Sequence, residues 1–330
     1  MRRVLVTGAG GFVGVNLVRG FAERGWSVVA NARRAPDGAT TAFLRPVAER
    51  VVWVIGDVTD RSWLEATIAR AALDAIVHAA AVTPSVEVER GRTRDVVTTN
   101  LTTTLDVLDA ARAHGVARVT FASSTGIYAG AARYRPRRED ELLLAHNLYA
   151  QCKLASEGLV RAYAQLHGMH ACSVRIGSVY GPMERPSQSR TGLSLVARLL
   201  PWALRAGRLR VRGADVGRDL IHASDVAGAI AALLDAPSLA HDVYNLASVD
   251  SYPVRSVLDA LARRTGATWY EHEGDDADLV YTPEHHRDGV DLSRLASDVG
   301  WTPHVGLDEG LADTLASAGF VSASEGRREV

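Results

Sequence analysis

The chain alternates short apolar runs with longer stretches in which apolar residues recur every three or four positions. Apolar runs without polar alternation are typical of parallel strands buried on both faces, and the longer spacing is typical of amphipathic helices. The first half predicts strands at Val4–Thr7, Ser27–Ala32, Val51–Gly56, Ala75–Ala80, Arg118–Ser123 and Ala171–Ile176. It predicts helices at Phe12–Arg24, Arg61–Ala71, Arg94–His114 and Leu148–His167. Such strand–helix alternation with right-handed crossovers predicts a doubly wound α/β fold around a parallel sheet.

The pattern changes after Tyr180-Gly181-Pro182. A loop is expected at Met183–Gly192, followed by helices and strands at Leu193–Ala206, Arg208–Val211, Ser224–Asp235, Val243–Leu246 and Val254–Thr265. These elements cannot complete a second doubly wound unit, so we expect a smaller mixed lobe that covers the carboxyl ends of the sheet, where ligands bind. The predicted division is a doubly wound domain at 1–176 with a return segment at 214–247, a substrate-binding lobe at 177–213 and 248–321, and a flexible tail at 322–330.

The first strand leads into a glycine-rich turn. Gly8, Gly11 and Gly14 have the G-x-x-G-x-x-G spacing, and the helical pattern begins near Phe12. Gly8 allows a tight turn, Gly11 lets the backbone approach a pyrophosphate, and Gly14 lets the helix pack close to the strand. The free N–H groups at the start of the helix then face the phosphates. This context predicts a dinucleotide-binding Rossmann domain.

Composition narrows the choice of partners. The chain has 37 Lys and Arg against 38 Asp and Glu, a formal net charge of −1, which gives no electrostatic argument for nucleic acid or membrane partners. Cys152 and Cys172 are the only cysteines, which favours a reducing compartment without a disulfide framework. The first strand begins at once, leaving no room for a signal peptide, and no apolar run reaches transmembrane length. We therefore expect a cytoplasmic protein.

Tyr149 and Lys153 lie one helical turn apart in a predicted helix. A phenol titrates near ~10, so it needs a nearby ammonium group to serve as a base at neutral pH. Ser124 follows a strand and would lie at the carboxyl edge of the sheet. In this interpretation Tyr149 exchanges the proton of a substrate hydroxyl as hydride moves, Ser124 stabilises the alkoxide, and Lys153 also holds the nicotinamide ribose. The alternative is an ordinary helical pair and a turn or helix cap.

Taken together, these features resemble the extended short-chain dehydrogenases/reductases, a family of NAD(P)-dependent sugar epimerases and dehydratases. The resemblance runs from Met1 to about Thr302 and rests on motifs in fixed order. These are Thr7–Gly14, Gly56–Val58, His78–Ala81, Phe121–Ser124, Tyr149–Lys153, Arg175–Pro182 and Gly217–His222.

The resemblance implies further site residues. Asp57 and Val58 would lie beside the adenine, Ala79–Ala81 would form a floor past the pyrophosphate, and Asn100 would support the site. The full set assigned to the cofactor is Gly8, Gly11, Phe12, Val13, Gly14, Asn31, Arg33, Arg34, Asp57, Val58, Ala79, Ala80, Ala81, Asn100, Ser123, Tyr149, Lys153 and Ile176. The substrate set is Thr83, Ser124, Ser178 and Arg218. Asp57 could alternatively cap a helix, and His78 is interpreted as a locally satisfied strand residue. His285 and His286 lack a surrounding ligand set, so no metal is expected.

The end of the second strand departs from the family pattern. The acidic residue that selects NAD is replaced by Asn31, followed by Arg33 and Arg34. Loss of the carboxylate removes repulsion of a 2′-phosphate, and the guanidinium groups could bind it. We favour NADP over NAD on this basis, with exposed loop arginines as the alternative.

Three further sites bear on the reaction. Thr125-Gly126 replaces the acidic pair of the dehydratases, which disfavours water elimination. Arg218 matches an arginine that pairs with a substrate diphosphate, unless it forms an ion pair with Asp219 or Asp225. Ser178 replaces the usual asparagine before Val-Tyr-Gly-Pro and weakens a diphosphate contact.

We therefore expect a nucleotide-sugar epimerase, acting at C4, with Tyr149 as base. One alternative is an NADP-dependent dehydrogenase or reductase of a sugar acid, lactone or other carbonyl compound. Another is a non-catalytic cofactor-binding scaffold, against which the intact Ser124, Tyr149 and Lys153 argue. In this family the helices matching Arg94–His114 and Leu148–His167 often pair with a second subunit, so a homodimer is expected.

Overall fold

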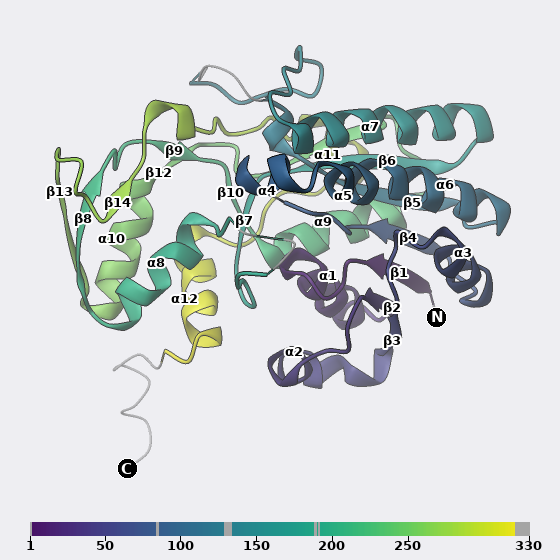
Figure 1. Cartoon of the computed structure of the whole chain (residues 1–330), viewed down its shortest axis with the longest axis horizontal. Coiled ribbons are helices and arrows are strands. Elements are labelled where there is room, and N and C mark those ends of the chain that lie inside the picture. The colour runs from purple at the N-terminus through teal and green to yellow at the C-terminus, as the bar shows by residue number, and fades with distance from the viewer. Residues whose placement is uncertain (1, 84–85, 129–133, 188–189, 191, 321–330) are drawn as a thin grey trace.

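A computed structural model of the chain describes residues 2–83, 86–128, 134–187, 190 and 192–320. The predicted flexible tail at 322–330 lies outside the described residues. Two lobes stand side by side in Figure 1, the larger built around a sheet and the smaller around α8, α10 and α12.

The larger lobe contains a sheet of seven strands in the order β11-β6-β5-β4-β1-β2-β3. Every pairing in it is parallel. The strands are β1 (Arg3–Thr7), β2 (Ser27–Ala32), β3 (Val51–Ile55), β4 (Ala75–His78), β5 (Arg118–Ser124), β6 (His170–Ile176) and β11 (Val243–Leu246). The doubly wound α/β fold predicted from the apolar runs is confirmed.

Helices cover both faces of this sheet. One face carries α1 (Phe12–Glu23) and α9 (Ala223–Asp235), and the other carries α3 (Arg61–Arg70), α6 (Thr103–Ala113) and α7 (Leu148–His167). The contact of α1 with α9 depends on Gly20, because a Cβ there would lie 2.4 Å from the Cβ of Ala227. Both faces of the sheet are therefore buried over the inner strands, which explains why these strands lack polar alternation, whereas the edge strand β3 leaves Val52 and Ile55 exposed.

The predicted helix at Arg94–His114 is interrupted in the structure. It consists of α5 (Thr93–Val97), a π-helical turn at Thr98–Thr102, and α6. The turn contains Asn100, whose side chain accepts from the N–H of Val82 at 3.2 Å and donates to its C=O at 2.9 Å. The regular α-helical hydrogen bonding is thus interrupted at Asn100, the residue that fixes the segment after β4. Single π-helical turns of this kind are often found near functional sites.

The smaller lobe has its own apolar cluster and a three-stranded parallel sheet in the order β13-β8-β14. Its elements are α8 (Leu195–Leu204), β8 (Arg208–Arg212), α10 (Val254–Thr265), β13 (Thr268–Glu271), β14 (Leu279–Val280) and α12 (Leu307–Ser317). Short strands lie between the lobes: β7 (Ser178–Tyr180) pairs with β10 (Leu220–His222), and β9 (Gly217–Arg218) pairs with β12 (Tyr252–Pro253). The remaining elements are α2 (Gly38–Leu44), α4 (Val86–Gly91), α11 (Ser293–Val299) and short 3₁₀ turns at Arg45–Arg50, Thr125–Tyr128 and Pro283–His285.

The two apolar clusters follow the predicted division only in outline. Val179, Leu295 and Trp301 come from segments assigned to the substrate lobe but pack in the cluster of the larger lobe, whereas Ala214 and Leu220 come from the return segment and pack in the other. The division at 1–176 with 214–247 therefore stays a prediction.

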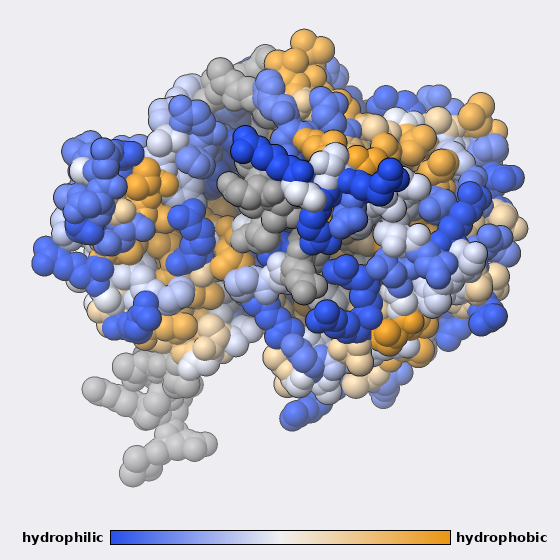
Figure 2. Space-filling model, in the orientation of Figure 1, coloured by the Kyte–Doolittle hydropathy of each residue, from blue (hydrophilic) through white to orange (hydrophobic). Residues whose placement is uncertain are grey.

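Hydrophilic residues dominate the face of the molecule drawn in Figure 2, with smaller apolar areas between them. Within the described residues, no helix combines the length and the apolar character needed to cross a membrane.

Candidate active site

A cleft of about 1400 Å³ lies at the carboxyl edge of the parallel sheet, between the two lobes. The segments that follow β1, β2, β4, β5 and β6 form its floor, and residues of the smaller lobe form its other wall. Ligands of doubly wound sheets bind at this edge because the loops there converge on one crevice. The structure thus places the sequence motifs of the first lobe around one cavity.

The glycine turn closes tightly at the start of α1. Gly8 has a φ of +71°, and a Cβ at this position would lie 2.7 Å from the Cα of Ala80. A Cβ at Gly14 would lie 2.1 Å from the carbonyl oxygen of Gly8, so only glycine fits there. Gly11 caps α1 without a side-chain hydrogen bond, which leaves the first N–H groups of the helix for a ligand. This cradle fits the pyrophosphate of a dinucleotide, and Phe12 and Val13 also line the cleft.

The small residues after β4 are held by Thr7. Its hydroxyl oxygen accepts from the N–H groups of Ala79 at 3.1 Å and Ala80 at 3.2 Å. Ala79, Ala80 and Ala81 line the cleft. His78 is fully buried, and its two ring nitrogens lie 2.8 Å from Thr7 Oγ1 and 3.2 Å from Thr103 Oγ1. Because both ring nitrogens have a partner, the interpretation of this residue as locally satisfied is confirmed. Burial lowers the pKa of His78 to about 3.

The end of β2 presents two kinds of side chain to the cleft. Asn31 is only 2% exposed, and its amide donates to the carbonyl oxygens of Val54 and Gly56 while its oxygen lies 3.5 Å from the N–H of Gly8. Arg33 and Arg34 are exposed and line the cleft. Asn31 therefore braces the glycine turn against β3 and also lines the cleft, and the two arginines add positive charge at this end.

Asp57 and Val58 line the cleft beyond the end of β3. The Asp57 carboxylate accepts from the N–H and hydroxyl of Thr59 at 3.0 and 2.9 Å. The helix that follows is capped by Asp60, which accepts from the N–H of Trp63. Asp57 thus fixes the turn before the cap and not the helix itself.

Tyr149 meets two other hydroxyl groups inside the cleft. Ser124, at the end of β5, and Thr83, in the segment after β4, line the cleft together with Tyr149. Burial raises the pKa of Tyr149, and the Ser124 hydroxyl, the positive charge of Arg190 and the Thr83 hydroxyl oppose this increase. Three hydroxyl groups from three separate segments therefore surround one position in the cleft.

The start of α7 sets the position of Tyr149. Asn147 caps the helix by accepting from the N–H of Ala150 at 2.8 Å, and the Glu89 carboxylate accepts from the N–H of Tyr149 at 3.0 Å. Lys153 follows one turn later and is 1% exposed. Its ammonium donates to the carbonyl oxygen of Ala122 at 2.8 Å and lies 5.7 Å from the centroid of the Tyr149 ring.

The residues behind this cluster form a buried polar network. Ser123 donates to Glu157 at 2.5 Å, and Glu157 forms a buried ion pair with Arg175 at 2.9 Å. The guanidinium of Arg175 also donates to the hydroxyl of Tyr128, which in turn donates to Asn245. Ser123 and Ile176, at the ends of β5 and β6, both line the cleft, and the bond to Glu157 ties Ser123 to the buried network.

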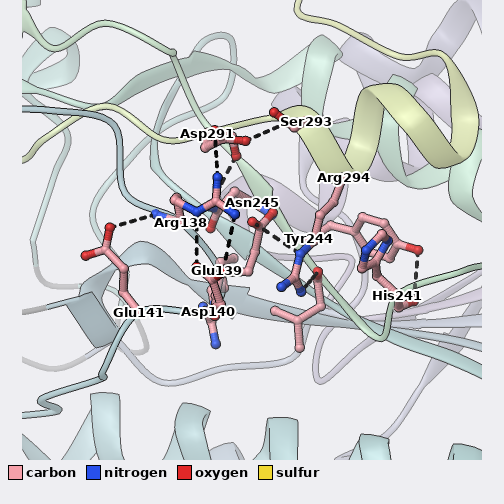
Figure 3. A network of polar contacts seen from close by, with 12 residues as sticks. Arg138, Glu139, Asp140, Glu141, His241, Tyr244, Asn245, Asp291, Ser293 and Arg294 are labelled. Atoms are coloured by element: carbon pink, nitrogen blue, oxygen red, sulfur yellow. Dashed lines mark hydrogen bonds and ion pairs between the residues drawn. The ribbon is translucent and has the colours of Figure 1, made fainter.

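Figure 3 shows how this network continues outward to the segment before α7. Glu139 accepts from the N–H of Asn245 at 2.9 Å and lies 3.6 Å from Arg294, and Arg138 bonds to Asp140 at 3.2 Å. The segment that leads into α7 is thereby attached to β11 and α11.

Three arginines also line the cleft: Arg198 of α8 in the smaller lobe, Arg218 of β9 between the lobes, and Arg287. Arg218 donates to Ser178 Oγ at 3.2 Å and to the carbonyl oxygen of His285, and Arg198 and Arg218 lie 5.6 and 5.8 Å from the centroid of Tyr281. Burial and the neighbouring Arg218 cation lower the pKa of Arg287. Such a concentration of positive charge favours an anionic ligand.

The acidic residues near Arg218 have other partners. Asp219 accepts from the hydroxyl groups of Ser178 at 2.6 Å and Thr125 at 2.5 Å, and Asp225 accepts from the N–H groups of His304 and Val305. Over the described part of the chain, neither carboxylate forms an ion pair with Arg218. The alternative that Arg218 serves only as a partner of Asp219 or Asp225 is therefore wrong.

Sequence reasoning missed Arg198, Arg287 and Arg190, which line the cleft. No spacing or motif marks them, because they come from α8 and from loops without a repeating pattern. In the described ranges, no group of three or more His, Cys, Asp or Glu side chains has the arrangement of a metal site. The rings of His285 and His286 bond to Thr282 and to the N–H of Gly217.

Comparison with known proteins agrees with this geometry. The model of the NAD dependent epimerase/dehydratase family matches residues 4–247. The chain is 29% identical to a UDP-glucose 4-epimerase of Corynebacterium glutamicum over 97% of its length and 96% of the relative. It is 28% identical to a dTDP-glucose 4,6-dehydratase of Mycolicibacterium smegmatis, covering 95% of this chain and 92% of the other.

A solved structure of a protein with one of these names has the same fold. The UDP-glucose 4-epimerase of Thermus thermophilus, crystallised in complex with NAD, superposes with a TM-score of 0.76 at 27% identity, over 97% of this chain and 100% of that one. The relatives are enzymes of the short-chain dehydrogenase/reductase type. The chain belongs to the NAD dependent epimerase/dehydratase family.

Proposed function

We propose that this protein is a nucleotide-sugar epimerase that acts at C4 of the sugar, with Tyr149 as its base. The observation that carries the proposal is that the hydroxyl groups of Tyr149, Ser124 and Thr83 line one cleft, with the ammonium of the buried Lys153 5.7 Å from the Tyr149 ring centroid. A bound nicotinamide would supply a hydride acceptor and donor. Tyr149 takes the proton of the reacting hydroxyl and later returns it, while Ser124 donates a hydrogen bond to the oxygen as its charge changes.

The arginine cluster supports a nucleotide sugar as substrate. Arg198, Arg218 and Arg287 would bind the diphosphate, leaving the sugar near Tyr149. Relatives in the family act on UDP-sugars and a dTDP-sugar, according to their names. The remote charge would also orient the sugar for reaction at one carbon.

The carboxylates of the cleft argue against dehydration. Elimination of water needs an acid and a base near the sugar. Within the described residues, the carboxylates that line the cleft are Asp37, Asp57 and Asp95, and each has another partner, namely Arg185, Thr59 and Arg92 respectively. Thr125 follows Ser124 and is committed to Asp219. The arrangement therefore suits oxidation and return of hydride better than elimination.

A specific observation favours a second candidate, an NADP-dependent dehydrogenase or reductase of a sugar acid, lactone or other carbonyl compound. Arg33 and Arg34 are exposed at the cleft, and the nearby Asp37 carboxylate is paired with Arg185 at 2.8 Å. A 2′-phosphate would therefore meet positive charge there. We propose that the enzyme accepts NADP on this ground.

One experiment separates the two candidates. The purified enzyme is incubated with UDP-glucose, UDP-glucuronic acid or dTDP-glucose, and the sugars are followed by proton NMR together with the absorbance of reduced nicotinamide. An epimerase gives the C4 epimer from at least one sugar with no net accumulation of reduced cofactor. A product formed in step with reduced cofactor identifies the second candidate. No conversion of any of the three, with reduction of a carbonyl compound by NADPH, would overturn the epimerase proposal.

We also propose a homodimer formed through α6 and α7, which pack beside one another on one face of the sheet. Both helices expose an apolar side chain, Leu105 on α6 and Leu166 on α7. Sedimentation of the purified protein at several concentrations tests this, and a Leu166→Glu variant that sediments as the wild type does would place the interface elsewhere.

A further inference from the structure

Arg190 reaches from the smaller lobe to the glycine turn of the larger one. It lies between β7 and α8, and its backbone forms a parallel β-bridge with Thr83. Its guanidinium carbon is 5.4 Å from the centroid of the Phe12 ring, and Phe12 is the first residue of α1. Its positive charge also acts on Tyr149. The side chain therefore lies between the start of α1 and the catalytic tyrosine.

The Arg190 guanidinium has a hydrogen-bond partner at one Nη atom and none at Nε. One Nη donates to Glu184 at 2.7 Å, and Glu184 is itself fixed by the N–H of Ser194 at 2.8 Å and its hydroxyl at 2.5 Å. The Nε of Arg190 is buried and has no hydrogen-bond partner among the residues that the structure describes. A buried donor of a cation without an acceptor is costly, so a ligand atom is expected to supply one.

The start of α1 indicates which ligand this is. Gly11 caps α1 without a side-chain bond, so the free N–H groups and the helix dipole favour an anion there. We propose that Arg190 binds the pyrophosphate of the dinucleotide cofactor from the side opposite α1. The inference needs only that the protein binds a dinucleotide, and it does not depend on which sugar is the substrate.

A second arginine of the same segment contacts the larger lobe farther along the cleft. Arg185 pairs with Asp37 at 2.8 Å and donates to Thr40 Oγ1 at 3.1 Å, both in the region after β2. The Arg185 guanidinium holds the pKa of Asp37 well below its usual range. The segment is thus attached to the larger lobe on the side of the cleft near Arg33 and Arg34, and Arg190 adds a contact at the glycine turn. This arrangement would slow release of the cofactor, as suits an enzyme that restores its cofactor within each turnover.

The test measures binding of cofactor fragments and not turnover. Adenosine, which lacks phosphate, ADP-ribose, which has the pyrophosphate, and NAD are titrated into wild type, Arg190→Met and Arg190→Lys by calorimetry after bound nucleotide is removed. Arg190→Met should weaken ADP-ribose and NAD about tenfold to a hundredfold and leave adenosine unchanged. Arg190→Lys should lie between, because it keeps the charge and loses the planar fork. The release rate of NADH from Arg190→Met should rise by the same factor.

The control is Arg205→Met, which removes an exposed arginine at the end of α8 and should change none of these constants. Unchanged ADP-ribose binding in Arg190→Met would overturn the proposal, and so would an effect confined to the KM of a sugar nucleotide. If Arg190→Met also binds adenosine more weakly, the binding constants of Arg190→Lys decide whether the pyrophosphate contact exists. Intermediate loss of ADP-ribose with normal adenosine supports the contact, and equal loss of both ligands overturns it. A negative result here would not bear on the proposed epimerase activity, because that activity is measured on the sugar.

Discussion

The ammonium group of Lys153 donates to the carbonyl oxygen of Ala122 at 2.8 Å and is buried against the ring of Phe121, with its nitrogen 4.5 Å from the ring centroid. Burial lowers the pKa of Lys153 to about 7. Tyr149 is half-buried beside it, and removal from water raises the pKa of this phenol. The pair therefore needs additional negative charge nearby before Lys153 can stay protonated and favour the phenolate.

The first prediction is that cofactor binding takes up a proton above pH 7. The pKa of Lys153 in the free protein is lowered to about 7, so the side chain is mostly neutral at pH 8. The phosphates of a bound dinucleotide favour the charged form and raise that pKa. The bound state then carries more protons than the free state, and the dissociation constant should increase with pH, by at most about tenfold per unit. Calorimetry at pH 8 in two buffers with different ionisation enthalpies measures the uptake. Lys153→Met should lose it, and proton-neutral binding by the wild type would contradict the prediction.

The second prediction concerns the base. Tyr149→Phe should reduce turnover by about 100- to 10,000-fold, because the variant keeps the ring and loses the group that exchanges the proton. Binding of NAD should not change. Tyr270, an exposed tyrosine on β13, provides the matched control, and Tyr270→Phe should retain full activity. Comparable turnover in the two variants would remove Tyr149 from the mechanism.

The third prediction concerns the choice of cofactor. Replacement of both Arg33 and Arg34 by alanine should weaken NADP about tenfold or more and leave NAD unchanged, since only NADP carries the 2′-phosphate. Fluorescence titration with the two reduced cofactors checks this. Arg205→Ala, at an exposed arginine away from the cleft, should affect neither. If both cofactors bind the double variant as they bind the wild type, the two arginines are surface residues.

The parallel sheet could be predicted because its strands appear as apolar runs, and all of them except the edge strand β3 are buried on both faces. The interruption of the helix at Thr98–Thr102 could not, because it depends on the contact of Asn100 with Val82, 18 residues earlier in the chain. The strands β7 and β10 could not be predicted either, because they also depend on a contact between distant parts of the chain. They are three residues each and form by pairing with one another across a long separation, so neither has a local pattern.

The candidate site shows a similar contrast. Tyr149, Lys153 and the glycines follow from spacing within one element, and the structure brings them to one cleft. Asn31 lies on a strand whose two faces are both buried, so the sequence could not show that its amide turns toward Gly8 and Gly56. Arg190 and Arg287 lie in segments with no periodicity, and only the packing of the lobes places them beside the motif residues.

The last prediction tests the buried pair behind the site. Glu157 and Arg175 are each 3% exposed at their side chains and bond in several ways, at distances from 2.9 to 3.2 Å. Glu157→Gln leaves the guanidinium buried without its counter-charge and should lower the free energy of unfolding by about 3–5 kcal/mol. Urea unfolding measures this. Asp140→Asn, which removes the exposed partner of Arg138, should leave the midpoint unchanged. Because Ser123 also donates to Glu157, the variant should loosen the wall of the cleft and weaken cofactor binding as well. A Glu157→Gln protein as stable as the wild type would show that Tyr128 and the carbonyl oxygen of Glu139, the other acceptors of Arg175, are enough to hold it.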